Sequence, residues 1–442
     1  MENLFLYIFF TGAVLKFVTV HFLEYVDYKK RKLHGTEIPS ELEGHVDEAV
    51  LTKTCSYENT KYFFFIPRSI VFFLLKIFLV CIYFYQDVFA AVWNVTQNAY
   101  LTIILFEILV SLPGDVLSIP FDLYGEFRIE KKYGFSNMNL RMWIFDGIKS
   151  IILGLIMNAI LMGAVAFILI HLNQWWWLFV SSVMIIFSLG LSFIYPIFLA
   201  PLFNKFTPIE DEELKNRLEA LLEKTGFKSS GIYKMDASKR SRHSNAYFTG
   251  IGKSKRIVLY DTLIEQLTVD EIEAVLGHEL GHYKKHHIIK KMLVSVPLIF
   301  AVTFLVSLIL KYPPLYTSFG FAPELFKVEG LQSMHPLAAL EYAGIFLLGL
   351  SLSGFGIFTG LIQNFFSRKD EFEADRFSAE VCNGGEALCT ALIKLNKENL
   401  SEFVPPDIYC AFYYSHPPLL KRIRAIRQAG SYSETSSSAL SK

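Results

Sequence analysis

The sequence predicts a mainly α-helical, multi-pass membrane protein whose cytoplasmic portion contains a small β-sheet. Of its 442 residues, 52% are hydrophobic and only 19% are charged, which is less charge than a soluble protein usually carries. The mean hydropathy of +0.37 also points to a bilayer. Acidic and basic residues balance at 42 each, so we expect no nucleic-acid partner.

Seven apolar segments are each near or above the length that crosses a hydrocarbon core. The first could be mistaken for a secretory signal. However, Glu2 stands where a basic residue would be expected and no small-residue cleavage pattern follows, so we expect a retained helix. The predicted spans are 4–23, 69–89, 100–122, 151–172, 175–203, 292–310 and 343–365.

Lysine and arginine residues in the loops predict how the chain is oriented. Four of them follow the first span at 29–32, none lies in 86–98 after the second, and four again follow the third. Loops rich in these residues face the cytoplasm. The alternation continues through the seventh span. We therefore expect the N-terminus outside, and the C-terminus and the long segment 204–291 in the cytoplasm.

Polar and small residues inside the predicted spans indicate that these helices do more than anchor the chain. Glu107 and Asp115 lie in the third span, where buried acids normally face protein or water. They indicate either an interior aqueous cavity or a shorter span with Asp115 among the head groups. In the seventh span, the spacing of Gly356 and Gly360 favours close helix packing.

The cytoplasmic material falls into two pieces. The first contains an acidic helix at 211–225 and strand-like segments at 232–235, 245–249 and 256–260. The second is helical at both ends, and the Ser-rich tail after it is expected to be disordered. The predicted division is 1–203 (spans one to five with loops), 204–291 (catalytic segment), 292–366 (spans six and seven), 367–428 (second catalytic segment) and 429–442 (disordered tail).

The most specific motif is His278-Glu279-Leu280-Gly281-His282, an H-E-x-x-H pattern. Histidines four residues apart project from one helical face and reach a single zinc ion, and the Glu beside the first His reaches a metal-bound water. Thr268 and Glu271 form a capping box that starts a helix leading into the motif. This context predicts a zinc hydrolase rather than a surface helix with incidental histidines.

Such a site needs a third protein ligand and one open position. The metzincin pattern is excluded, because Lys285 and Ile288 stand where that class has Gly and His. His286 is a possible third ligand, although its lysine-rich surroundings favour the membrane surface. The acidic pair Glu371 and Asp375, after the seventh span, offers a better candidate. Asp375 lies four residues further on the same helical face, so one of the two acids could bind the metal while the other orients a ligand.

Three longer stretches carry a resemblance to a known family. They are 129–136 (IEKKYGFS), 241–250 (SRHSNAYFTG) and 414–423 (YSHPPLLKRI). Together with the two metal motifs, they resemble the type I CAAX prenyl proteases, which are integral-membrane zinc metallopeptidases of the gluzincin type. The resemblance implies seven transmembrane helices around a water-filled chamber, with the zinc site on its cytoplasmic side.

Residue by residue, the resemblance also implies roles. It assigns one Zn²⁺ per chain to His278, His282 and Glu371, and it makes Glu279 the general base. Asn245 matches the position that holds the substrate backbone, and His416 the one that steadies the transition state. Asp375 and Arg422 match residues that support the metal ligands.

The expected function is hydrolysis near the C-terminus of prenylated, CAAX-type proteins by a zinc-activated water. Substrate proteins and membrane lipids are the expected partners. The location would be the endoplasmic reticulum membrane in a eukaryote or the inner membrane in a bacterium. The segments 253–261 and 270–282 look more like bacterial members. This favours the alternative of a quality-control protease for unprenylated or misfolded proteins. A transporter or scaffold with a structural zinc is disfavoured, because structural sites have four ligands.

Overall fold

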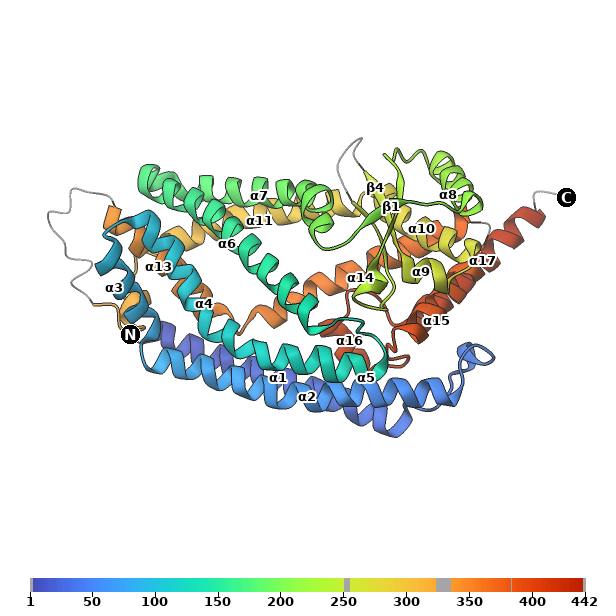
Figure 1. Ribbon diagram of the computed structural model, residues 1–442, viewed down its shortest axis with the longest axis horizontal. Helices are drawn as coiled ribbons and strands as arrows, with labels where there is room; N and C mark the ends of the chain where they lie inside the picture. Colours follow the sequence, from blue (N-terminus) through green and yellow to red (C-terminus); the bar gives the residue numbers. More distant parts are fainter. Residues whose placement is uncertain (1–2, 250–254, 323–334, 383, 440–442) are drawn as a thin grey trace.

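A computed structural model describes residues 3–249, 255–322, 335–382 and 384–439. The molecule is elongated, with long apolar helices along most of its length and a small sheet surrounded by shorter helices at one end (Figure 1). Six helices are long and apolar enough to cross a membrane. In chain order they are α1 (Leu4–His34), α2 (Glu48–Cys81), α4 (Ala99–Tyr124), α6 (Leu140–His171), α7 (Trp176–Ile194) and α11 (His287–Ile309).

The predicted seventh span is present but broken. It consists of α13 (His335–Leu352) and α14 (Gly356–Val381), and the two axes bend by 74° between Leu352 and Gly356. At this break Gly354 lies against the backbone of Gly12 in α1, where an added Cβ would come within 2.1 Å of the Gly12 carbonyl carbon. The sequence predicts an apolar span through 343–365, and the structure has it with a bend where Gly354 crosses close to α1. The described helices therefore give six spans, or seven if the bent pair counts as one.

Shorter helical elements complete the chain. The second predicted span, 69–89, covers the end of α2 and the start of a separate helix, since Tyr83 turns the chain with a φ of 56°. The remaining helical elements of the chain are η1 (Ser40–Leu42), α3 (Phe84–Thr96), η2 (Gly125–Glu130), α5 (Lys131–Tyr133), η3 (Asn173–Trp175), η4 (Tyr195–Leu199), η5 (Ala200–Leu202), α8 (Glu212–Thr225), η6 (Ala237–Lys239), α9 (Asp261–Gln266), α10 (Val269–Lys284), α12 (Pro314–Thr317), α15 (Glu386–Glu398), α16 (Asp407–Tyr413) and α17 (Leu419–Ala439).

The sheet has four strands in the order β1-β2-β4-β3. They are β1 (Phe206–Pro208), β2 (Ile232–Met235), β3 (Ala246–Thr249) and β4 (Arg256–Tyr260). β2 and β4 are parallel and the other two pairs are antiparallel, with Ala246 opposite Leu259. The sheet shares one buried core with α8 and α10, which includes Leu218, Ile257 and Leu276. This core fixes α10 relative to β3, which lies at the edge of the sheet.

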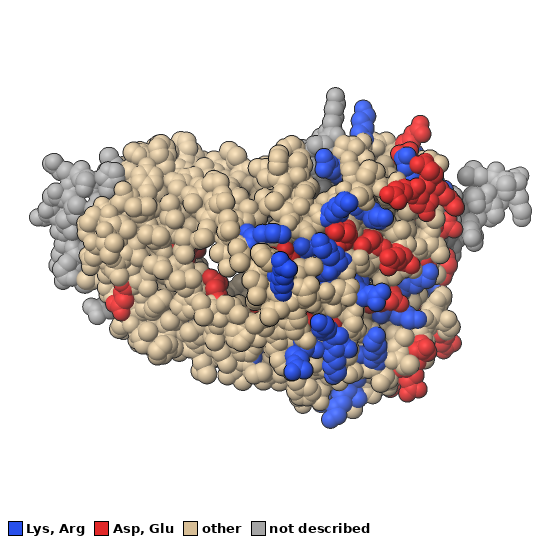
Figure 2. All heavy atoms as spheres, viewed as in Figure 1, with Lys and Arg blue, Asp and Glu red and all other residues tan. Residues whose placement is uncertain are grey.

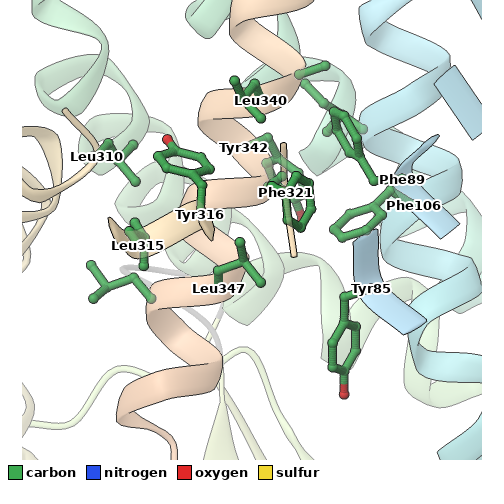
Figure 3. Close-up of a cluster of buried hydrophobic side chains, with 14 of the residues drawn as sticks. Tyr85, Phe89, Phe106, Leu310, Leu315, Tyr316, Phe321, Leu340, Tyr342 and Leu347 are labelled. Carbon is green, nitrogen blue, oxygen red and sulfur yellow. The ribbon is translucent and has the colours of Figure 1, made fainter. Parts of the chain in front are cut away.

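The apolar half is held together by aromatic residues near the end that is distant from the sheet. Phe89 lies edge-on to Phe106 and also contacts Phe321, with ring centroids 5.8 and 5.4 Å apart (Figure 3). The Tyr342 hydroxyl donates to Glu107 Oε2 over 2.6 Å, so this acid faces protein. Asp115 is exposed and accepts a hydrogen bond from Ser111. Figure 2 shows an indentation in the apolar half with acidic side chains at its edge.

The structure describes most of the tail 429–442, which the sequence predicts to be disordered, as a continuation of helix α17. Helix α17 continues to Ala439, and residues 440–442 lie outside the described ones. The segment 419–439 contains no proline, although Gly430 and its serines are weak helix formers. Its first half is tied down, because Ile423 and Ile426 are buried and Arg427 pairs with Glu386.

Candidate metal centre

Helix α10 begins with the predicted capping box. Thr268 accepts a hydrogen bond from the Glu271 amide, and the Glu271 carboxylate accepts one from the Thr268 amide at 2.8 Å. Lys394 of α15 also donates to this carboxylate, at 2.8 Å. The helix that carries the H-E-x-x-H motif therefore has a defined start and a fixed attachment to α15.

Two glycines on α10 let α14 approach it closely. A Cβ at Gly281 would lie 2.8 Å from the Cα of Ala374, and one at Gly277 would lie 2.7 Å from Cys382 Sγ. The two helices thus cross almost backbone to backbone. This crossing brings Glu371 and Asp375 of α14 next to the histidines of α10, although the two helices lie far apart in the sequence.

The structure brings together the three residues assigned to the metal. His278, His282 and Glu371 each present one ligand atom, and the three atoms lie within 4.8 Å of one another. Nε2 of His282 lies 3.2 Å from Nε2 of His278 and 3.3 Å from Glu371 Oε1. Nε2 of His278 lies 3.4 Å from Glu371 Oε2. Two imidazoles and one carboxylate with this spacing fit a tetrahedral zinc that keeps one open position.

The electrostatics also favour a cation here. Glu371 Oε2 is buried and receives no hydrogen bond among the described residues. Burial disfavours the charged form of His278. The neighbouring carboxylates of Asp375 and Glu371 outweigh this and raise the pKa of His278 to about 9. A site that attracts a proton so strongly also attracts a metal ion, which competes with protons for the same ligand atoms.

Glu279 lies beside this group on α10 and is largely enclosed. Burial raises the pKa of Glu279, while the nearby His278 and His282 oppose the shift. A carboxylate with a raised pKa is better suited to accept and return a proton near neutral pH. The position and the direction of the pKa shift are compatible with the predicted role of Glu279 as a general base.

Asp375 and Arg422 lie beside Nδ1 of His278, the ring nitrogen that faces away from the metal group, and Arg422 also lies 3.9 Å from Glu371 Oε2. Asp375 Oδ1 is 2.8 Å from His278 Nδ1, and Arg422 donates to both oxygens of Asp375, at 2.6 and 2.9 Å. All three side chains are buried. The carboxylate holds the His278 ring so that Nε2 faces the centre, and Arg422 holds the carboxylate.

His416 comes to the same place from the loop between α16 and α17. Its Nε2 lies 3.5 Å from Glu371 Oε1, and its side chain is 61% exposed. Ser415 Oγ lies 3.0 Å from the other ring nitrogen. An exposed imidazole at the rim of the metal group can reach a bound substrate, which a buried one could not.

Asn245 directly precedes β3. Its side-chain oxygen accepts a hydrogen bond from the Ala246 amide at 2.8 Å, and its carbonyl accepts one from Tyr260 at 3.1 Å. Phe248 of β3 packs against the core that includes Leu276 and Leu280 of α10. This packing holds the edge strand beside the helix that carries the metal motif. Asn245 itself is exposed, and the hydrogen bonds described for it go to Ala246 and Tyr260 rather than to the metal group.

His243 is a residue that the sequence reasoning gave no role. Its ring stacks on Phe135 at 4.1 Å, and its nitrogens lie 3.0 Å from Asn399 Oδ1 and 3.4 Å from Glu130 Oε2. Burial lowers its pKa, but the hydrogen bonds to Glu130 and Asn399 outweigh this and raise the pKa of His243. The cluster ties the segment before Asn245 to the end of the third span. His243 lies in the stretch 241–250, and Glu130 and Phe135 lie in 129–136, two of the three stretches that carry the family resemblance. Membership of these stretches was the one feature of the sequence that could have drawn attention to His243.

The two histidines that follow α10 differ from each other. His286 is exposed and stays outside the metal group, as expected. His287 is buried beside His282, a position that the sequence reasoning missed because the surrounding KKHHIIKK run is typical of a surface.

Comparisons with known proteins agree with this geometry. Residues 208–429 match Peptidase family M48, and residues 27–205 match the family described as CAAX prenyl protease N-terminal, five membrane helices. CAAX prenyl protease 1 of Saccharomyces cerevisiae is 32% identical over 429 residues, which cover 92% of each chain. A CAAX prenyl protease 1 homolog of Arabidopsis thaliana is 36% identical over 75% of this chain and 74% of its own.

A solved structure extends the likeness to the whole fold. The crystal structure of S. mikatae Ste24p superposes with a TM-score of 0.83 at 29% identity, covering 96% of this chain and 98% of that one. The chain belongs to Peptidase family M48, with the N-terminal membrane helices of the CAAX prenyl proteases, and is an integral-membrane metalloendopeptidase.

Proposed function

We propose that this protein is a zinc-dependent endopeptidase that cleaves near the C-terminus of prenylated, CAAX-type proteins at the cytoplasmic face of a membrane. The observation that carries the proposal is the convergence of His278, His282 and Glu371 around one point, with Glu279 beside them. The names of the relatives supply the substrate class, since the yeast and plant proteins are CAAX prenyl proteases.

The metal assignment follows from the donor set. Two imidazoles and one carboxylate hold a zinc ion and leave a coordination position open, whereas structural zinc sites have four protein ligands. We assign one Zn²⁺ per chain to His278, His282 and Glu371. When bound, the ion would polarise the scissile carbonyl and make a water molecule more acidic.

The remaining residues of the site handle protons and hold the substrate. Glu279 accepts the proton of the attacking water and returns it to the leaving amine. His416 donates a hydrogen bond to the oxygen that gains negative charge. The free edge of β3 pairs with the extended peptide through the main chain, and the exposed Asn245 amide holds the peptide backbone. Asp375 and Arg422 keep His278 in place.

The low burial of the membrane helices is evidence for an internal chamber that could hold the lipid part of the substrate. In the most apolar stretches of α2, α7 and α11, only 11%, 11% and 0% of the residues are buried. A tightly packed bundle would bury the inward faces of such helices, so these helices border open space on their inner side as well as lipid on their outer side. An aqueous chamber with apolar walls also suits the exposed Asp115.

The distribution of charge on the surface supports a cytoplasmic orientation of the metal group. Lys and Arg concentrate on the part of the surface next to the apolar half, where they would face head groups (Figure 2). The metal group lies in this charged part, which the positive-inside rule places in the cytoplasm. The membrane would be that of the endoplasmic reticulum in a eukaryotic host and the inner membrane in a bacterial one.

The test is a digest by the purified protein of one peptide in farnesylated and unprenylated form. We expect cleavage after the prenylated cysteine, with the unprenylated peptide cut much more slowly. Glu279→Gln keeps the side-chain shape but cannot take up the proton, so turnover should fall at least ~100-fold while zinc stays bound. Equal cleavage of both peptides would favour a quality-control protease instead, and no zinc-dependent cleavage of either would refute the peptidase assignment.

A further inference from the structure

His287 lies in an unusual turn between the metal-motif helix and the following membrane helix. α10 ends at Lys284, and His286 adopts a left-handed backbone with a φ of 57°. This conformation is rare for a residue with a side chain, and histidine is among those that adopt it more often. It lets the chain fold back so that His287, the first residue of α11, points towards α10. His287 is only 1% exposed, although lysines surround it in the sequence.

The ring of His287 contacts a metal ligand on one side and acids on the other. Its Nδ1 lies 2.9 Å from Nδ1 of His282, and the ring centroids are 5.0 Å apart at an angle of 75°. Its Nε2 lies 3.2 Å from Glu373 Oε2 and 3.7 Å from Asp370 Oδ1. Both acids belong to α14, the helix that also supplies Glu371.

The positions of the hydrogens follow from this geometry. Nε2 of His282 faces His278 and Glu371, so it must carry a free electron pair to bind a metal. His282 is then protonated on Nδ1, and this N–H donates to Nδ1 of His287. Because Nδ1 of His287 is the acceptor, His287 is protonated on Nε2, and that N–H donates to the Glu373 carboxylate. One arrangement satisfies all three contacts, and it leaves His282 in the tautomer that binds metal.

The outer end of this chain of hydrogen bonds is also fixed. Lys290 lies 3.4 Å from Glu373, and Lys291 lies 3.3 Å from Asp370. These lysines belong to α11, so the acids of α14 are held between His287 and the lysines of one helix. The arrangement parallels that of the other ligand, where Asp375 and Arg422 hold His278.

We propose that His287 is a positioning residue for the metal centre, which holds His282 in the metal-binding tautomer and orientation. The inference rests on the zinc site of the proposed function and adds a residue that neither metal motif contains. Partners that hold a ligand in this way typically contribute 10- to 100-fold to metal affinity. His287→Ala should therefore lower zinc affinity by roughly that factor while His278, His282 and Glu371 are all present.

The experiment measures zinc affinity by chelator competition, in detergent, for the wild type and three full-length variants. His287→Ala removes the acceptor. His287→Asn places an amide oxygen near the position of Nδ1 and should recover much of the affinity. His286→Asn is the control, because asparagine tolerates the left-handed turn and the side chain it replaces is exposed.

Thermal melting with and without zinc separates positioning from a structural role. If His287 positions His282, His287→Ala should melt close to the wild type without metal and gain less on adding zinc, since stabilisation by a ligand follows its affinity. A structural role would lower both melting temperatures equally. Native zinc affinity in His287→Ala would overturn the inference. A wild type that binds no zinc would instead refute the metal site of the proposed function.

Discussion

Gly281 of α10 and Ala374 of α14 lie so close that a Cβ on the glycine would come within 2.8 Å of the alanine Cα. The atoms it would meet belong to the backbone, so a larger residue cannot be accommodated by turning a side chain. Gly281 directly precedes His282 on α10, and Ala374 lies about one helical turn after Glu371 on α14. The helix separation at this point therefore helps to determine the metal geometry.

We therefore predict that Gly281→Ala moves α14 away from α10 and weakens zinc binding. Metal sites depend on ligand positions to within about 0.5 Å, so a shift of a few tenths of an ångström matters. Zinc affinity should fall at least ~10-fold, accompanied by a lower melting temperature. The control is Gly349→Ala on α13, where an added Cβ meets nothing within 4 Å. Native zinc affinity in Gly281→Ala would contradict the assigned role of the crossing.

A second prediction concerns the third ligand. Glu371→Gln keeps the size of the side chain but removes the negative charge that lies between His278 and His282. Zinc content after dialysis should drop from one per chain to well below one, and peptidase activity should drop with it. Excess zinc should restore part of the activity if the remaining ligands still bind weakly. Glu380→Gln is the comparison, because Glu380 is exposed on the same helix and lies outside the metal group. Full metal content in Glu371→Gln would remove Glu371 from the ligand set.

The third prediction separates the roles of His416 and Asn245. His416→Ala should lower kcat by roughly 10²-fold with zinc content unchanged, because its hydrogen bond forms to charge that develops during the reaction. Asn245→Ala should mainly raise KM, because it holds the peptide equally in the ground state and the transition state. Measuring kcat, KM, zinc and melting temperature on the same preparations tests both. If His416 only starts helix α17, its variant would melt earlier but keep its kcat.

Much of the fold could be predicted because its signals are local. The strands β2 and β4 coincide with the strand-like segments 232–235 and 256–260, and the capping box marks the start of α10. The membrane spans can be recognised because each apolar segment is long enough to cross a hydrocarbon core. The break after Leu352 could not be predicted in this way, since it depends on the packing of Gly354 against Gly12, which are far apart in the chain.

In the candidate site, too, the residues with a local sequence signal could be predicted, and those that depend on tertiary contacts could not. The spacing of His278 and His282 shows that they share a helical face, whereas assigning Glu371 to the metal required the resemblance to a known family. His287 was missed because composition describes the neighbourhood in sequence and burial depends on the fold. Only the turn at His286 and the acids of α14 turn a lysine-rich segment inwards.

The last prediction concerns the pH dependence of stability at the start of α10. Burial would raise the pKa of Glu271, but the hydrogen bonds from Lys394 and the Thr268 amide outweigh it and lower the pKa below the ordinary value of 4.5. The unfolded chain then binds more protons than the folded one as the pH falls. The charge of Glu271 thus stabilises the fold above pH ~4.5, and this contribution is lost as the pH falls through the lower, folded pKa.

Glu271→Gln can still accept from the Thr268 amide but cannot form the ion pair with Lys394. At pH 7 we expect it to be less stable by on the order of 1 kcal/mol, which corresponds to a melting temperature lower by roughly 2 °C. Melting curves from pH 7 to pH 3.5 should be recorded with a chelator present, because zinc release at low pH would otherwise add its own pH dependence. The control is Glu265→Gln, since Glu265 is exposed on α9. The gap between wild type and Glu271→Gln should narrow as the pH falls below ~4.5. A gap that stays constant throughout would show that the charge of Glu271 does not stabilise the start of α10.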